Sequence, residues 1–174
     1  MFNIKVPTHP YRHDKKVTIS LAENQAVCLS GRNGCGKTTV LKILAGHLQL
    51  SCTQPLSDAV YIPAEPILLN GLSVKRQLEY YQTLNPKILS IDWLQDQLTK
   101  PVESLSKGQA QMLSLMQLCY GKRQIWLLDE PFNALDEYAC NTFSQFMDNH
   151  IHAGGAILYS SHIKLREGDQ CILL

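Results

Sequence analysis

Apolar and polar residues alternate with a period of two near the start of the chain. Residues 2–6 (Phe-Asn-Ile-Lys-Val) and 17–21 (Val-Thr-Ile-Ser-Leu) both follow this pattern. Such alternation is typical of strands that bury one face. The residues between them, 7–16, are mostly polar. We therefore predict a small antiparallel hairpin whose turn occupies residues 7–16.

Short apolar runs farther along the chain predict buried strands of a parallel sheet, because helices cover both faces of such a sheet. The runs are 26–29, 59–62, 125–130, 156–159 and, as a last edge strand, 171–174. Helical periodicity separates them over 39–48, with an end near Gly46, and over 73–81, 88–98, 110–120 and 138–149. These patterns predict an α/β fold with an N-terminal antiparallel hairpin and a helical insert.

Length and composition place these elements in one domain. The chain has 174 residues, of which 45% are hydrophobic and 18% charged, enough for one α/β domain with a core. The net charge of +1 gives no basic stripe, so nucleic acid is not an expected partner. No apolar run approaches the ~18 residues of a membrane span and the N-terminus lacks a signal sequence, so we expect a soluble, cytosolic chain. Six cysteines without a CxxC pair are interpreted as reduced thiols.

A glycine-rich stretch between the 26–29 run and the 39–48 helix fits the phosphate-binding pattern G-x-x-x-x-G-K-[ST]. It consists of Gly31, Arg32, Asn33, Gly34, Cys35, Gly36, Lys37 and Thr38. Glycines allow a tight turn around a triphosphate, and the following helix presents its positive end to the anion. We expect Lys37 to bridge the β- and γ-phosphates, Thr38 to offer its hydroxyl to Mg²⁺, and Thr39 to lie beside the α-phosphate.

One aromatic residue of the predicted hairpin turn is a candidate for the base of the same nucleotide. Tyr11 could stack on an adenine ring, although an ordinary exposed tyrosine is an equally good interpretation. His9 and His13, in the same segment, are interpreted as solvated residues.

The pentapeptide Leu-Ser-Lys-Gly-Gln, residues 105–109, precedes the 110–120 helix. Ser106 and Gly108 would stand at a helix N-terminus, where a hydroxyl and backbone amides are available to an anion. Taken alone, the pentapeptide would be interpreted as a plain helix cap.

The apolar run 125–128 leads into two carboxylates, Asp129 and Glu130. Ligands of open α/β sheets bind at the carboxyl ends of strands, so Asp129 can reach Mg²⁺ through water and Glu130 can polarise an attacking water. Adjacent strand residues point to opposite faces, so the two roles require the strand to end between them. Pro131 is expected to supply that break; a solvated turn is the alternative.

A histidine, His162, follows the 156–159 run at the same predicted edge of the sheet. There it can donate to the γ-phosphate and sense its loss. The alternative is a structural histidine with ordinary hydrogen-bond partners.

With these motifs in this order, followed by Asn133-Ala134-Leu135-Asp136, the chain resembles the ATP-binding subunit of ABC transporters. The resemblance covers essentially the whole sequence, and its most specific element is the LSxGQ signature. Residues 129–136 and 153–162 look most like the ATP-binding subunit of the haem exporter of cytochrome c maturation.

The resemblance implies an ABC-type phosphate-loop ATPase with a RecA-like parallel sheet, in which 1–65 and 121–174 form the ATP-binding core and 66–120 the helical signature subdomain. It implies a head-to-tail dimer with a second copy or a homologous subunit, with each ATP held between one phosphate loop and the other subunit's signature. The implied roles are base for Glu130, γ-phosphate switch for His162, signature contacts for Ser106, Gly108 and Gln109, and a dimer contact for Asp136. Integral membrane subunits would be the other partners, with this chain peripheral on the cytoplasmic face of the inner or plasma membrane.

Four departures from the family pattern bear on these implications. Glu65 stands where the family usually has a glutamine that ligates Mg²⁺, and a glutamate oxygen can also serve a hard cation. Lys107 replaces a usually small signature residue, and Met112 and Gln117 stand where arginines are common. The segment 46–59 is short, so we expect a hairpin usual in the family to be truncated there. None of these departures removes a catalytic residue.

Two other functions compete with a transporter ATPase. A soluble ABC-type ATPase acting on nucleic acid or ribosomes usually carries a long coiled-coil insert or tandem ATPase units, which do not fit in 174 residues. A nucleoside or small-molecule kinase would leave the 105–109 signature and the Asp129–Glu130 pair unexplained.

Overall fold

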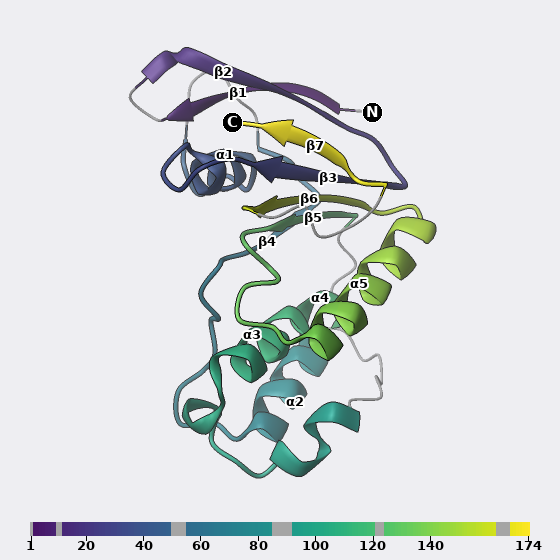
Figure 1. Cartoon of the computed structure of the whole chain (residues 1–174). Helices are drawn as coiled ribbons and strands as arrows, with labels where there is room; N and C mark the ends of the chain where they lie inside the picture. Colours follow the sequence, from purple (N-terminus) through teal and green to yellow (C-terminus); the bar gives the residue numbers. More distant parts are fainter. Residues whose placement is uncertain (1, 10–11, 50–54, 85–91, 121–123, 163–167) are drawn as a thin grey trace. The chain divides into compact units, whose positions relative to one another are not determined.

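The structure, a computed structural model, describes residues 2–9, 12–49, 55–84, 92–120, 124–162 and 168–174 (Figure 1). The chain divides into two compact units. The first, which we call the sheet unit, contains residues 1–64, 123–131 and 142–174. The second, the helical unit, contains residues 65–122 and 132–141.

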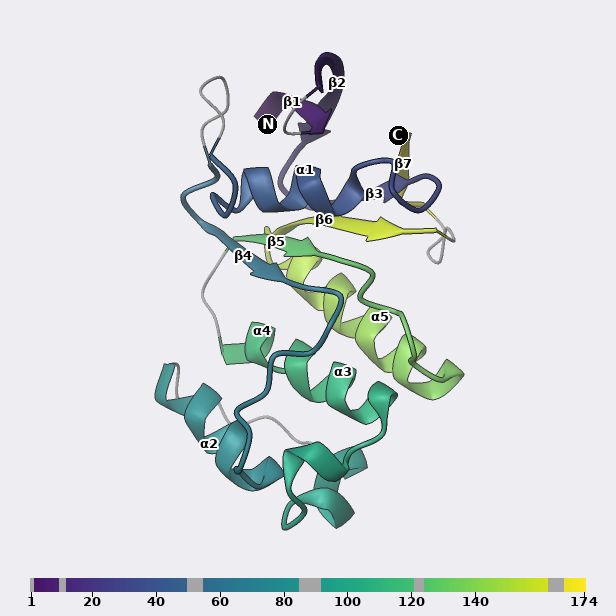
Figure 2. The ribbon, with the colours of Figure 1, turned by 90° about the vertical axis from the view of Figure 1, so that its left-hand side faces the viewer.

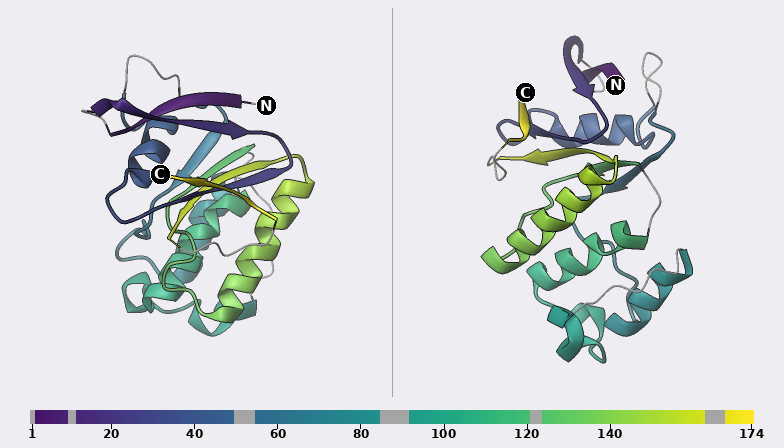
Figure 3. Two further views of the ribbon diagram at one scale, coloured as in Figure 1. Left: turned by 45° about the horizontal axis from the view of Figure 1, so that its top comes forward. Right: turned by 90° about the vertical axis from the view of Figure 1, so that its right-hand side faces the viewer.

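Within the described residues, the sheet unit is built on a five-stranded parallel sheet of order β4-β5-β6-β3-β7. Its strands are β3 (Gln25–Ser30), β4 (Ala59–Ile62), β5 (Ile125–Leu128), β6 (Ala156–Ser161) and β7 (Gln170–Leu173). All five predicted apolar runs are therefore strands, and the run at the end of the chain is an edge strand, as predicted. Figure 3 shows β7 beside β3 at that edge.

The predicted N-terminal hairpin is present, but its turn was placed wrongly. Strands β1 (Phe2–His9) and β2 (Arg12–Leu21) pair from Phe2 opposite Leu21 through Pro7 opposite Lys16. The segment predicted as a turn is thus mostly strand, because backbone pairing can continue through polar residues where a sheet faces water. The register shifts between Pro7 and His9, as expected for a proline that has no N–H to donate.

Helices cover both faces of the parallel sheet, as Figure 2 shows for α1 (Lys37–Leu44) and for the part of α5 (Glu137–His152) within the sheet unit. Strand side chains alternate between these faces. Leu127 belongs to the core that includes α1, whereas Trp126 contacts Phe146 of α5, with ring centroids 5.2 Å apart. Helix α1 begins two residues before the predicted start and ends at Leu44, close to the end predicted near Gly46. Gly46 has a φ of 78°, the left-handed conformation common just after a helix.

The helical unit has a small core of its own around Val74, Leu78, Tyr81, Val102 and Leu113. Its helices are α2 (Val74–Leu84), α3 (Lys107–Leu115) and α4 (Gln117–Tyr120), with 3-10 turns at Asp92–Gln97 and Val102–Ser104. None of the described helices of the protein is long and apolar enough to span a membrane.

Two helix predictions in this unit need correction. The helix predicted over 110–120 begins at Lys107 and is interrupted at Met116. At this point the Gln117 side-chain amide also donates to the Ser114 carbonyl, at 2.7 Å. Of the helix predicted over 88–98, residues 88–91 lie outside the described residues, and 92–97 form a 3-10 helix instead.

Candidate active site

The candidate site lies at the carboxyl ends of the parallel strands, where α/β sheets bind their ligands. The phosphate loop joins the end of β3 to the start of α1. Gly36, the N-cap of α1, has a φ of 112°, and Gly34 has a φ of 81°. Both values lie in the region that glycine adopts without strain. At Gly34 a Cβ would meet nothing within 4 Å, so backbone conformation, rather than space, calls for glycine there.

Lys37 is the first residue of α1 and is only 7% exposed. Its Nζ donates to the Gly31 carbonyl at 2.8 Å and to the Arg32 carbonyl at 3.4 Å. The same ammonium lies 3.7 Å from Oε1 of Glu130. The lysine charge is therefore held between the loop backbone and a carboxylate of the next motif.

Asp129 is 3% exposed, and its carboxylate accepts hydrogen bonds from three hydroxyls. Thr38 Oγ1 donates to Oδ2 at 2.8 Å, and Ser160 Oγ donates to Oδ1 at 2.6 Å. The Tyr61 hydroxyl donates to Oδ2 at 3.5 Å. Burial, and then the nearby Asp129 charge, raise the pKa of Tyr61, so this hydroxyl remains a donor at neutral pH.

Glu130 occupies a sharp turn with a φ of 45°. Strand β5 ends at Leu128, before both acids, so the prediction that it ends between them was wrong. The backbone of Glu130 itself makes the turn, one residue before Pro131. Its N–H donates to Ser160 Oγ at 2.8 Å, and its Oε2 lies 3.0 Å from Nδ1 of His162.

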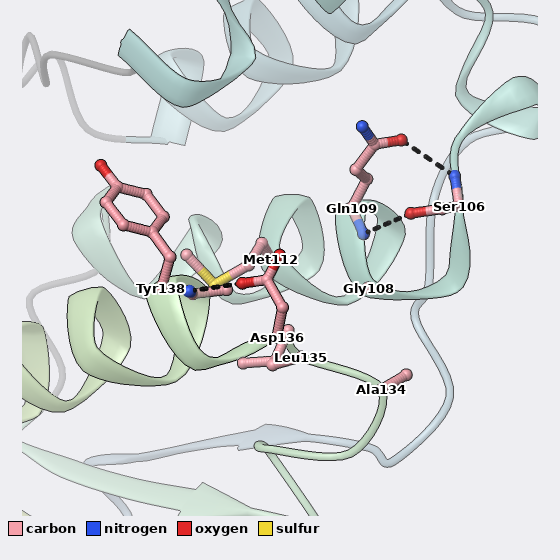
Figure 4. Close-up of a pocket in the computed structure, with 9 residues that line it drawn as sticks. Ser106, Gly108, Gln109, Met112, Ala134, Leu135, Asp136 and Tyr138 are labelled. Atoms are coloured by element: carbon pink, nitrogen blue, oxygen red, sulfur yellow. Dashed lines mark hydrogen bonds between the residues drawn. The ribbon is translucent and has the colours of Figure 1, made fainter.

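The signature residues lie in the helical unit and form a pocket of about 270 Å³ with the segment before α5 (Figure 4). Ser106 and Gln109 form a capping box, in which each backbone N–H donates to the other's side chain, at 3.0 and 3.2 Å. Ser106 thus caps the helix that contains the signature, as predicted. Asp136 also lines the pocket, and its Oδ1 accepts from the Ala139 N–H at the start of α5.

Gly108 approaches this segment closely. A Cβ at Gly108 would lie 2.5 Å from the Ala134 carbonyl oxygen, and Ala134 itself has a φ of 64°. Contacts this short are essentially absent from proteins, so no larger residue fits without displacement. The position of Gly108 in the signature is therefore fixed by packing against the Ala134 segment inside the helical unit.

The structure brings Lys37, Thr38, Asp129, Glu130 and His162 together in the sheet unit. Ser106, Gly108, Gln109 and Asp136 lie together in the helical unit, which also contains the exposed Glu65. Tyr11 lies outside the described residues.

Two residues that contact Asp129, Ser160 and Tyr61, were not among the predicted site residues. The available signal was weak. Ser160 is a polar residue at the end of an apolar strand, two positions before His162.

Comparison with known proteins identifies the family. The model of the ABC transporter family matches residues 15–133. The chain belongs to the ABC transporter family. As an ABC ATP-binding subunit, it is an ATPase with the phosphate-loop fold that the sequence predicted.

Curated relatives within the ABC transporter family match most of the chain. The cytochrome c biogenesis ATP-binding export protein CcmA of Rhodobacter capsulatus is 35% identical over 86% of this chain and 73% of its own length. The protein of the same name from Roseobacter denitrificans is 34% identical over 90% of this chain and 80% of its own length. The predicted likeness to the cytochrome c branch is therefore confirmed.

Solved ABC transporter structures share the fold. An ATP-binding ABC transporter protein from Pyrococcus furiosus superposes with a TM-score of 0.76 at 21% identity, covering 99% of this chain and 98% of that one. An ATP-binding subunit of another ABC transporter gives a TM-score of 0.69 at 23% identity, over 91% of this chain and 79% of that one. At these identities the likeness concerns the fold alone.

Proposed function

We propose that this ABC ATPase binds Mg·ATP at the carboxyl edge of its sheet, hydrolyses it in a head-to-tail dimer, and drives a membrane partner in cytochrome c biogenesis. The observation that carries the proposal is the cluster of Lys37, Thr38, Asp129, Glu130 and His162, each within hydrogen-bond or ion-pair distance of at least one other member. The signature pocket in the helical unit would supply the second half of a composite site to a partner subunit.

The residues present fit a magnesium nucleotide. Thr38 and Asp129 offer a hydroxyl and a carboxylate that meet at 2.8 Å, and Mg²⁺ prefers oxygen ligands. When bound, Mg²⁺ would neutralise phosphate oxygens. Glu65 is a further oxygen donor proposed for it. The phosphates would compete with Glu130 for Lys37. The Lys37 ammonium lies 3.7 Å from the Glu130 carboxylate, and a more highly charged phosphate would attract it more strongly.

Glu130 is the proposed general base. Its carboxylate is one-fifth exposed, with a side-chain exposure of 19%, and so can accept a proton from a water molecule. His162 is 55% exposed and lies 3.0 Å from Oε2 of that carboxylate. This contact supports the proposal that His162 orients Glu130 and presents its other ring nitrogen to the γ-phosphate.

Coupling to membrane subunits, and haem as the transported substrate class, are proposed from the family resemblance of the sequence, and the relatives support the cytochrome c branch. Proteins named as cytochrome c biogenesis export proteins match 86% and 90% of this chain. The same relatives do not favour an ATPase that acts on nucleic acid or ribosomes. We therefore place the protein on the cytoplasmic face of the membrane that contains its partner subunits.

Nucleotide binding is tested by isothermal titration of ATP with Lys37→Ala and with Lys42→Ala. Both lysines belong to α1, but only Lys37 lies in the cluster. Loss of a hydrogen bond to a charged group costs about tenfold or more in affinity, so Lys37→Ala should weaken binding by at least that factor. Lys42→Ala should bind as the wild type does. Equal affinities of the two variants would contradict the proposed site.

The partner is tested by affinity purification of the Glu130→Gln form from detergent-solubilised membranes with ATP and Mg²⁺. We expect a multispanning membrane protein, accompanied by haem-handling proteins, and its loss when Lys37→Ala is added. Recovery of ribosomal or DNA-bound proteins alone would overturn the transporter assignment in favour of a non-transport ATPase.

A further inference from the structure

Ser160 makes two hydrogen bonds that connect the two acids of the site. It lies on β6, is fully buried, and has an exposure of 0%. Its hydroxyl donates to Oδ1 of Asp129 at 2.6 Å and accepts from the N–H of Glu130 at 2.8 Å. One oxygen atom therefore contacts the carboxylate of one acid and the backbone of the next.

The bond to Asp129 determines which carboxylate oxygen faces the phosphate loop. Because Ser160 engages Oδ1, Oδ2 is the oxygen that accepts from Thr38. The main chain of Asp129 is held separately, through its N–H to the Ile62 carbonyl at 2.9 Å. With the main chain fixed, the remaining freedom of the carboxylate is rotation of the side chain, which the serine hydroxyl restricts.

The bond to Glu130 stabilises an unfavourable backbone conformation. A φ of 45° lies in the left-handed region, which non-glycine residues rarely adopt. The serine oxygen accepts the N–H of this peptide in that conformation. The turn directs the Glu130 side chain toward Lys37 and His162 instead of continuing strand β5.

We propose that Ser160 is a positioning residue for ATP hydrolysis, whose hydroxyl aligns the Asp129 carboxylate for the metal and fixes the peptide that aims Glu130. The inference rests on the function proposed above. Strand β6 lies between β3 and β5 in the sheet, with Ser160 opposite Leu29 at the end from which the phosphate loop departs. His162 follows two residues later, so this one strand would set the orientation of metal ligand, base and switch residue together.

A threonine and valine pair at position 160 tests the hydroxyl itself, because both side chains are β-branched and differ by a hydroxyl in place of a methyl group. Binding of a fluorescent ATP analogue to the purified full chain is measured in EDTA and across a Mg²⁺ titration. We expect all forms to bind alike in EDTA, since Lys37 and the loop are unchanged. Ser160→Val should raise the Mg²⁺ concentration for half-maximal binding by about 10- to 100-fold, as for loss of other groups that orient metal ligands. Ser160→Thr should stay within about threefold of the wild type.

Turnover gives a second readout. At saturating Mg²⁺, kcat of Ser160→Val should remain at least about tenfold below that of Ser160→Thr, because the base is misplaced. Ser161→Ala is the matched control, since it removes a buried hydroxyl from the adjacent position of the same strand, which points to the opposite face. It should leave the Mg²⁺ requirement unchanged. If Ser160→Thr or Ser160→Val does not fold, Ser160→Ala is used in its place, because alanine adds no atoms to the buried site.

The outcomes separate the inference from the proposed function. Equal Mg²⁺ requirements and equal kcat values for the serine, threonine and valine forms would overturn the role of Ser160 while leaving the ATP site intact. A shift shared by Ser161→Ala would show a general packing effect and would also overturn it. Absence of Mg²⁺-dependent nucleotide binding in the wild type would overturn the proposed function itself.

Discussion

The two adjacent acids of the site have opposite surroundings, although they are neighbours in the sequence. Asp129 is buried and surrounded by hydroxyl groups, whereas Glu130 is partly exposed and lies between Lys37 and His162. A carboxylate that only accepts hydrogen bonds from fixed donors is suited to hold an ion. One that reaches water is suited to accept a proton from it. The different roles proposed for the two acids follow from these surroundings.

Thiol reactivity gives a prediction at single residues. Cys35 belongs to the phosphate loop, and the exposed Cys171 pairs in register with the buried Cys28. Burial, and then the neighbouring Cys171, raise the pKa of the Cys28 thiol to about 12. Since the thiolate is the reactive form, Cys28 should be alkylated most slowly of the three at pH 8.

Peptide mass spectrometry after iodoacetamide treatment, with and without Mg·ATP, checks these rates. Nucleotide should protect Cys35, because the loop would be covered by phosphates, and should leave Cys171 unaffected. Alkylation of Cys35 should in turn abolish ATP binding. Equal labelling of Cys35 with and without ATP would contradict the placement of the nucleotide in this loop.

The sequence predicted the residues of the site that belong to recognisable motifs, and missed those that act through tertiary pairing. Lys37, Thr38, Asp129, Glu130 and His162 were predicted from spacing and position, and the structure brings them together. Tyr61 and Ser160 each resemble ordinary strand residues. Their contacts with Asp129 depend on which strands are neighbours in the sheet, and local periodicity does not specify strand order.

At the scale of elements, the first turn of α3 is constrained from two sides. The capping box fixes its N-terminus, and Gly108 contacts the Ala134 carbonyl segment closely. A side chain at this point cannot be accommodated by moving a flexible group, because the neighbour is backbone. The signature helix and the segment before α5 are thus packed as one piece within the helical unit.

Gly108→Ala should therefore destabilise the protein. Overpacking of this kind costs about 1–3 kcal/mol in the free energy of unfolding, measured by urea denaturation. ATP affinity at the phosphate loop should be retained, while ATP turnover should fall. Lys107→Ala, at the exposed neighbouring position, is the control and should change stability by less than about 0.5 kcal/mol. Wild-type stability of Gly108→Ala would show that the two segments separate easily.

Helix α5 is anchored to the sheet by a stacked pair. The His150 ring lies 3.7 Å from the Trp126 ring at an interplanar angle of 10°, and its Nε2 is 3.1 Å from the Gln124 carbonyl. A Cβ at Gly155 would lie 2.2 Å from this imidazole, so the glycine makes room for the ring. Burial lowers the pKa of His150 below its ordinary 6.5.

This histidine should make stability fall in mild acid. Because its pKa is lowered in the folded state, the unfolded chain binds the proton first as the pH falls through 6.5. The urea midpoint should therefore decrease between pH 7 and pH 5.5. The urea midpoint of His150→Gln should be lower than that of the wild type at pH 7, since the stacking is lost. It should fall less between pH 7 and pH 5.5. An unchanged pH dependence in His150→Gln would assign the effect to other groups.

The predictions of helices and strands succeeded where periodicity reflects burial. They were wrong where local hydrogen bonds determine the end of an element. The five strands of the parallel sheet followed from apolar runs. The hairpin turn, the interruption at Met116 and the end of β5 did not, because each depends on the hydrogen bonding of the backbone at that point. Local backbone hydrogen bonding leaves no periodic signal in the sequence.

At the scale of the whole molecule, the two candidate half-sites belong to different units. The phosphate loop and both acids lie in the sheet unit, while Ser106, Gly108 and Asp136 line the pocket of the helical unit. In the proposed dimer, each ATP would join the sheet unit of one subunit to the helical unit of the other. Bound triphosphate would then hold the dimer together, and hydrolysis would release it.

Glu130→Gln should trap this dimer. Glutamine keeps the shape of the side chain but cannot act as a base, so ATP should bind without being hydrolysed. Light scattering coupled to size-exclusion chromatography should show a species of twice the 19.6 kDa chain mass with Mg·ATP. ADP should leave the chain monomeric. Adding Lys37→Ala should abolish the dimer, because nucleotide no longer bridges the subunits. If Glu130→Gln turns over ATP at the wild-type rate, Glu130 is not the base; if it binds ATP as a monomer, the membrane subunits are needed to align the two halves.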